Sequence, residues 1–107
     1  MLTKSEFTQQ ILTWANGYCV AGLRWGQAVF NSTEELFGPE VARTSQFVYN
    51  VDCYHDDNKV NEFLDKCYDL YVINQKKPID YQKVLDWLNT SQDENSRLEI
   101  IKTIECE

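Results

Sequence analysis

Apolar residues recur every three or four positions along most of this chain, and this spacing constrains the fold more than any other feature. The clearest stretch runs from residue 60 to residue 71, where apolar side chains share one face of a helix and charged side chains share the other. The apolar stripe comprises Val60, Phe63, Leu64, Cys67, Leu70 and Tyr71. A helix of this kind buries its stripe against other helices, so the sequence predicts an all-α fold.

Two further helices are predicted in the first third of the chain. Thr3 and Glu6 form a capping box that opens the first, because the Thr hydroxyl accepts a backbone amide while the Glu side chain reaches back. We expect Trp14 on the buried face of this helix and the end of the helix at Gly17. The second helix is predicted from Gly22 to Asn31.

Capping residues mark four more helix starts. Ser32–Glu35 has the pattern of a second capping box that opens a short helix, and Gly38-Pro39 ends that helix and begins another. Asp56 or Asp57 caps the helix with the clear stripe. Asp80 caps a later helix that turns Tyr81, Val84, Leu85 and Leu88 inward.

Two stretches fit a strand as well as a helix. Gln46–Tyr54 alternates in the manner of a strand but has no second strand to pair with, so we expect an ordered, aromatic-rich connection. Arg97–Cys106 is ambiguous in the same way, and its helical surroundings favour a helix. Asn74–Pro78 is predicted to be a connector. Residues 1–107 are therefore expected to form a single helical domain, a compact arrangement of five or six short helices.

The second predicted helix carries an unusual polar ridge opposite its apolar face. The apolar face holds Leu23, Trp25, Gly26, Val29 and Phe30, and the opposite side holds Arg24, Gln27, Ala28 and Asn31. A glycine on an apolar helix face indicates close approach by another helix. Arg24 can pair with a carboxylate such as Asp52 or Asp57, while Gln27 and Asn31 can satisfy loop backbone groups. We interpret Arg24, Gln27 and Asn31 as a structural polar brace to the Asp-rich turn.

The charge balance limits the classes of partner. The chain has 10 basic and 17 acidic residues and a formal net charge of -7, which argues against direct binding of nucleic acid or an anionic membrane. No apolar run approaches the roughly 18 residues of a membrane helix, and the first residues lack the apolar segment of a signal peptide. We therefore expect a cytoplasmic protein whose partner has a basic surface.

Metal binding and catalysis find little support in the sequence. The four cysteines, at positions 19, 53, 67 and 106, form no C-x-x-C pair, and we expect them to be reduced. Asp52, His55, Asp56 and Asp57 lie close together but lack the alternating carboxylates and central Gly of a Ca²⁺ loop. His55 is the only histidine, and no glycine-rich phosphate loop is present. We predict no catalytic residue, no metal and no cofactor.

The middle of the chain resembles a group of small, largely uncharacterised bacteriophage and prophage proteins. The resemblance rests on Leu23–Asn31, which contains an Arg-aromatic-Gly-Gln helix ending in Asn, on the Asp-rich turn Asp52–Asp57, and on the Phe-Leu helix that begins at Val60. Such proteins often have Asp-Pro-Phe-Tyr where this chain has Asp52-Cys-Tyr-His55. The resemblance covers roughly residues 20 to 71 and implies a small helical fold and a mobile-element origin, with no established chemistry.

These features favour an interaction protein that binds and inhibits a protein of the bacterial host, with antiviral defence as one class of target. Its expected binding residues, provided that they are exposed, are Trp25, Tyr49, Asp52, Tyr54, Asp56 and Asp57. The alternatives are a self-assembling structural or regulatory protein of the mobile element, which would be a homo-oligomer, and a metal-dependent or cysteine-based enzyme.

Overall fold

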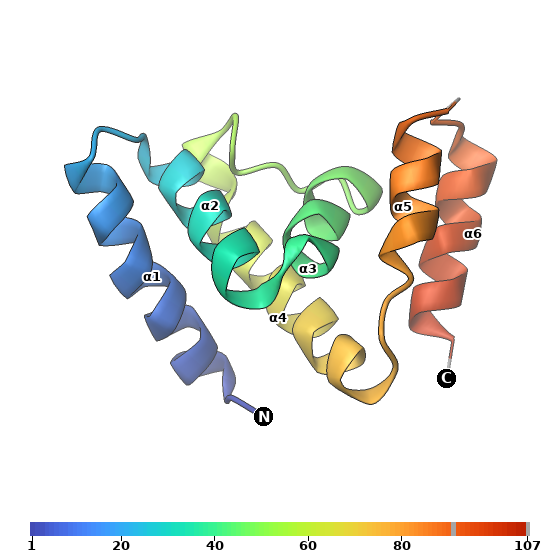
Figure 1. Ribbon diagram of the computed structural model, residues 1–107, viewed down its shortest axis with the longest axis horizontal. Coiled ribbons are helices and arrows are strands. Elements are labelled where there is room, and N and C mark those ends of the chain that lie inside the picture. Colours follow the sequence, from blue (N-terminus) through green and yellow to red (C-terminus); the bar gives the residue numbers. More distant parts are fainter. Residues whose placement is uncertain (91, 107) are drawn as a thin grey trace.

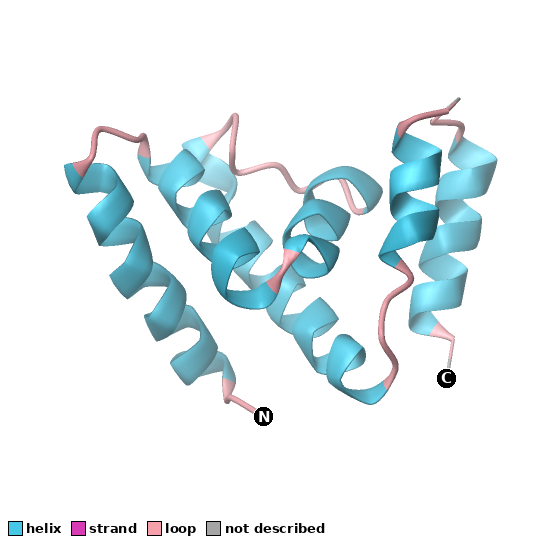
Figure 2. Cartoon of the chain, viewed as in Figure 1, coloured by secondary structure: helices cyan, strands magenta, loops and turns pink. Residues whose placement is uncertain are grey.

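A computed structural model describes residues 1–90 and 92–106, and within them it contains six α-helices and no strand. Figure 1 shows the helices gathered into a flattened body, and Figure 2 shows the short loops that join them. The body measures 39 × 30 × 20 Å. The prediction of an all-α domain of five or six helices is confirmed.

The first, second and fourth helices enclose most of the core. Helix α1 (Lys4–Val20) lies beside α2 (Trp25–Phe37), and α4 (Val60–Lys76) passes behind α2 (Figure 1). The stripe predicted for residues 60–71 is buried throughout, because all six of its apolar side chains face α1, α2 or the segment after α3. Phe7 of α1 packs its ring 5.1 Å from the ring of Tyr71 on α4.

A short helix and a π-helical segment join α2 to the Asp-rich turn. Helix α3 (Pro39–Arg43) begins with proline, as predicted, and continues into a π-helical segment, η1 (Thr44–Val48). The residues of η1 include four that are buried, three of them polar, and the Thr44 hydroxyl oxygen has no hydrogen-bond partner within the described structure. The first part of Gln46–Tyr54 is thus helical, and the remainder is the ordered connection expected. A 3₁₀ turn, η2 (Asp57–Lys59), then leads into α4.

The last two helices form a hairpin that packs on η1. Helix α5 (Tyr81–Leu88) is capped by Asp80 as predicted, and α6 (Glu94–Glu105) confirms the preference for a helix near the C-terminus. Arg97 of α6 donates a hydrogen bond of 2.7 Å to the Val48 carbonyl oxygen at the end of η1. Figure 1 shows this pair to the side of the other helices.

Three predictions about helix ends and faces were wrong near the N-terminus. Helix α1 does not end at Gly17 but continues to Val20, and Gly22, with a φ of 105°, makes the turn instead. Trp14 lies at the edge of the apolar stripe and is 47% exposed. Ala28 of α2 was predicted on the polar side, but it is buried. Helices α1 and α4 both pack on α2, so more than its one apolar face is covered.

The second capping box does not begin a helix. Ser32 and Thr33 are buried within a single helix, α2, that runs on to Phe37. Their hydroxyls donate to the carbonyl oxygens four residues earlier, at 2.7 Å for Ser32 and 2.8 Å for Thr33. Each hydroxyl shares a carbonyl oxygen of its own helix and thus has a partner although it is buried, so neither residue has to end the helix.

After residue 70, one helix end and one buried helix face also differ from the prediction. Helix α4 extends through Lys76, so only the end of the predicted Asn74–Pro78 connector is non-helical. On α5 the buried residues are Val84 and Trp87, whereas Tyr81, Leu85 and Leu88 are half-buried. The Trp87 indole N–H donates to the Asp93 carbonyl oxygen at 3.0 Å, which lets this ring lie in the hairpin core.

Candidate interaction site at the Asp-rich turn

The N-terminus of α2 is held by the Asp-rich turn rather than by a second helix. The Gly26 amide donates to Asp57 Oδ1 at 2.9 Å, and the Cys53 thiol lies 3.4 Å from the Gly26 carbonyl oxygen. A Cβ at Gly26 would lie 2.0 Å from the Cys53 carbonyl oxygen. The prediction of close approach at Gly26 is therefore confirmed, but the approaching backbone belongs to the turn.

Asp57 caps α2 from a distant part of the chain. The first amides of a helix have no partner within it, and the N-cap residue of α2, Arg24, provides no side-chain acceptor. The Asp57 carboxylate satisfies the second of these amides and places a negative charge at the positive end of the helix dipole. We call the set of contacts made by Arg24 and Gly26 with residues 53–57 the tie.

Arg24 completes the tie. Its Nε lies 3.4 Å from Asp57 Oδ1, and its guanidinium also donates to the Tyr54 carbonyl oxygen. Gln27 Oε1 accepts the Arg24 amide at 3.3 Å, so this side chain acts at the helix start. Asn31 takes no part in the tie among the described residues and instead lines a neighbouring groove.

Asp52 forms its own network, separate from Arg24. One carboxylate oxygen accepts from Gln46 Nε2 at 3.1 Å, and the other lies 2.7 Å from His55 Nδ1. Partial burial acts to raise the pKa of Asp52, but the hydrogen bonds from His55 and Gln46 outweigh it and hold that pKa below its ordinary value. Asp52 thus fixes the start of the turn, as Asp57 fixes its end.

The expected aromatic residues do not gather on one surface. Trp25 is 36% exposed at the start of α2, and the half-buried Tyr54 packs edge-on against Phe30 with ring centroids 5.6 Å apart. Tyr49 contacts other elements: its hydroxyl donates to Glu105 on α6 at 2.9 Å, and Lys66 lies over its ring. Burial, together with the Glu105 carboxylate, raises the pKa of Tyr49. Tyr54 is therefore part of the turn and Trp25 lies between the two residues that contact it, whereas Tyr49 joins α4 to the C-terminal hairpin.

A shallow groove beside the turn contains an aromatic residue that the sequence did not single out. Phe47 follows the buried residues of η1 and is 41% exposed. Phe47 belongs to Gln46–Tyr54, a stretch for which the sequence predicted only an ordered connection. The groove is lined by Phe30, Asn31, Glu34, Arg43, Gln46, Phe47, Tyr54 and His55. Arg43 and Glu34 form an ion pair at 2.6 Å, so the lining combines charged and aromatic side chains.

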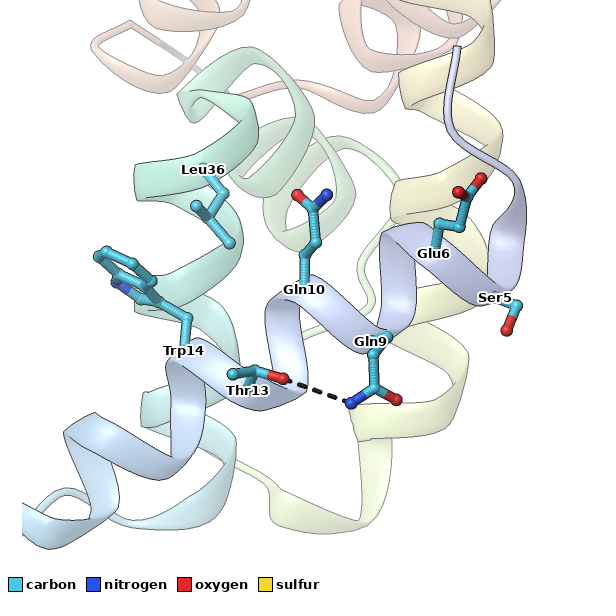
Figure 3. Close-up of a pocket in the computed structure, with 7 residues that line it drawn as sticks. All are labelled: Ser5, Glu6, Gln9, Gln10, Thr13, Trp14 and Leu36. Atoms are coloured by element: carbon cyan, nitrogen blue, oxygen red, sulfur yellow. Dashed lines mark hydrogen bonds between the residues drawn. The ribbon is translucent and has the colours of Figure 1, made fainter.

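A second groove, between α1 and the end of α2, was also missed. Figure 3 shows Trp14 and Gln10 projecting from α1 on the side of Leu36 of α2. The Trp14 indole N–H donates to Glu35 Oε2 at 3.4 Å. The signal available in the sequence was the position of Trp14 at the edge of its stripe, where a large ring is only partly covered.

The described residues provide little for metal or thiol chemistry. No group of three His, Cys, Asp or Glu side chains among them is placed to hold a metal ion. Burial and the nearby Asp52 charge raise the pKa of the Cys53 thiol to about 12, and burial raises that of Cys67 as well. A thiol with a raised pKa forms little of the reactive thiolate at neutral pH.

Comparisons with models of protein families, with curated proteins and with solved structures give no match to this chain. Within the described residues, none of the helices is both long and apolar enough to span a membrane.

Proposed function

We propose that this chain is an interaction protein of a bacteriophage or prophage that binds a host protein and inhibits it by steric occlusion. The observation that carries the proposal is an exposed aromatic residue, Trp25, whose chain neighbours on both sides, Arg24 and Gly26, make the tie to the Asp-rich turn. A residue held in place before binding loses little conformational freedom on association, and Trp is a frequent anchor of protein interfaces. The cytoplasm of the bacterial host is the compartment that this role requires.

The charges of the turn favour a basic partner. Asp56 and Asp57 are exposed, and the whole chain has a net charge of -7. Acidic groups around an aromatic anchor accelerate encounter with a basic surface and orient the partner. The neighbouring groove with Phe47 and Tyr54 offers a second apolar contact on the same turn. A component of antiviral defence is the class of target that this account favours.

Affinity capture from a bacterial lysate with matched variants tests the proposal. Wild-type protein is expected to retain one stoichiometric host protein, identified by mass spectrometry, and Trp25→Gln is expected to lose it at a temperature at which circular dichroism shows the variant to be folded. Leu98→Gln is the control, because Leu98 on α6 is also an exposed hydrophobic residue, 51% exposed. Equal capture by both variants, or no specific capture by wild type, would refute the proposal.

Asp56→Asn tests the role of charge separately from structure. The Asp56 side chain accepts the Asn58 amide at 3.0 Å, and Asn can keep that cap while removing the charge. We expect slower association with the captured protein and a weaker dependence of the rate on salt, with the dissociation rate nearly unchanged. An unchanged association rate would show that the turn's charge does not steer the partner.

A further inference from the structure

The end of η1 lies between the groove beside the turn and the C-terminal hairpin of α5 and α6. Phe47 lines that groove, whereas the next residue, Val48, is fully buried. The residue before them, Gln46, lines the same groove and donates to Asp52 of the turn at 3.1 Å. Because these residues share one short π-helical segment, a shift of η1 would alter the groove and the turn together. Segments of this kind are rare and often lie at functional sites.

Two contacts from α6, which we call the clasp, hold the end of η1. The last carbonyl groups of a helix have no amide partner within it, and the Arg97 guanidinium donates to the Val48 carbonyl oxygen at 2.7 Å. The side chain of Arg97 is 25% exposed and is fixed in turn by Glu94, which accepts from Arg97 Nε at 3.0 Å. The second contact is the bond of 2.9 Å from the Tyr49 hydroxyl to Glu105. A hydrogen bond from a charged donor is roughly twice as strong as a neutral one, so Arg97 makes the stronger of the two contacts.

The hairpin has a smaller buried core than the helices on which it packs. Helices of 8 and 12 residues, such as α5 and α6, are marginally stable by themselves. Whereas α4 alone buries the six side chains of its stripe, the buried apolar residues of the hairpin, among those that the structure describes, are Val84, Trp87, Ile100 and Ile104. An element with few buried apolar contacts opens at a lower free energy than the whole fold. We therefore expect the hairpin to detach before the remaining helices unfold.

We propose that the C-terminal hairpin controls the groove beside the turn, with Arg97 as the positioning residue. While the clasp is closed, η1 holds Phe47 in the groove and Gln46 against Asp52. When the hairpin detaches, the Val48 carbonyl group loses its donor and the end of η1 loosens. A partner that requires the ordered groove then binds in proportion to the fraction of molecules whose clasp is closed. This inference rests on the proposed function, since it gives the binding surface of that function a means of regulation.

Hydrogen exchange followed by NMR tests the opening in wild type with no partner present. The amides of Tyr49 and Val51 donate to carbonyl oxygens at the start of η1, both at 3.1 Å, and therefore report whether its end is closed. We expect both amides to share the opening free energy of Ile100 on α6, and to exchange at least roughly tenfold faster than Phe63 on α4. Protection equal to that of Phe63, or weaker than that of Ile100, would overturn the proposal.

Variants of Arg97 test its positioning role. Arg97→Met removes the charged donor, and we expect the side-chain amide signals of Gln46 and the ring signals of Phe47 to shift. A chemical shift reports local geometry, so a loss of overall stability alone would not move these signals. Arg97→Lys retains a donor and should restore them, and Lys102→Met is the matched control, because it removes a positive charge from an exposed position of α6. Unchanged signals of Gln46 and Phe47 in Arg97→Met would show that the hairpin does not position η1.

Capture of the host protein separates this inference from the proposed function. Wild type and Lys102→Met are expected to retain the host protein equally, and Arg97→Met to lose it in proportion to the fraction of molecules with an open clasp. If wild type captures no host protein, the proposed function fails, and the NMR measurements still decide whether the hairpin fixes the groove. Full capture by Arg97→Met, despite shifted signals of Phe47, would show that the hairpin does not control binding.

Discussion

Replacing Gly26 by Ala would place a methyl carbon 2.0 Å from the Cys53 carbonyl oxygen, where ordinary contact begins at 3.4 Å, so the turn must retreat by about 1.4 Å. Overpacking of this kind costs about 1–3 kcal/mol. The retreat also breaks the Gly26–Asp57 bond of 2.9 Å and the Arg24 contact with Tyr54, at about 1 kcal/mol each. The higher helix propensity of alanine returns about 1 kcal/mol. We expect a net loss of about 2–4 kcal/mol of unfolding free energy.

Gly17→Ala is the matched control, because it makes the same chemical change in a helix where the new methyl meets open space. We expect it to stabilise the fold by up to about 1 kcal/mol. Urea unfolding followed by circular dichroism gives the free energies of unfolding of the two variants. If both variants are stabilised to a similar degree, the turn does not press on Gly26 and the reasoning fails.

Three further predictions concern the buried polar groups and the thiols. Thr44→Val replaces a buried hydroxyl that lacks a partner with a methyl group, and should raise the unfolding free energy by about 1 kcal/mol; a loss of stability would show that the hydroxyl is satisfied. Because the pKa of Asp52 is lower in the folded state, its network stabilises the protein above the unfolded value of about 3.9 and is lost as the pH falls through the folded value. Asp52→Asn should therefore flatten the decline in stability as the pH falls below the unfolded value, and an equally steep decline would contradict this assignment. A thiol reagent should modify the exposed Cys106 in the native protein but reach Cys53 and Cys67 only on unfolding, and early labelling of either buried thiol would count against the packing described.

The parts of the fold that could be predicted from the sequence are those set by local spacing. The α4 stripe from Val60 to Tyr71 was predicted in full. A helix with charged side chains on one face can bury only the opposite, apolar face. The capping residues Thr3 and Asp80 were predicted for the same local reason. Ser32 was misread because a capping box and a buried hydroxyl inside a helix have the same local pattern, and only the surrounding helices distinguish them.

The candidate site depended on contacts between distant residues. Sequence reasoning predicted that Arg24 would meet an acidic residue of the turn and that Gly26 would admit a close neighbour. It could not choose between Asp52 and Asp57, because 33 positions separate Arg24 from the carboxylate that it meets. It also grouped Tyr49 with the turn residues as expected binding residues, whereas Tyr49 is bonded to Glu105 of α6. The exposure of Trp14 and Phe47 likewise depends on what the tertiary fold leaves uncovered.

Hydrogen exchange of the Gly26 amide, followed by NMR, tests the tie most directly. An amide in the first turn of a helix has no partner within the helix and ordinarily exchanges fast. The bond of 2.9 Å to Asp57 predicts slow exchange in wild type. Asp57→Asn keeps an oxygen acceptor and should retain most of this protection, whereas Asp57→Ala should abolish it. Fast exchange at Gly26 in wild type, or protection unchanged in Asp57→Ala, would contradict the tie that positions Trp25 beside the turn.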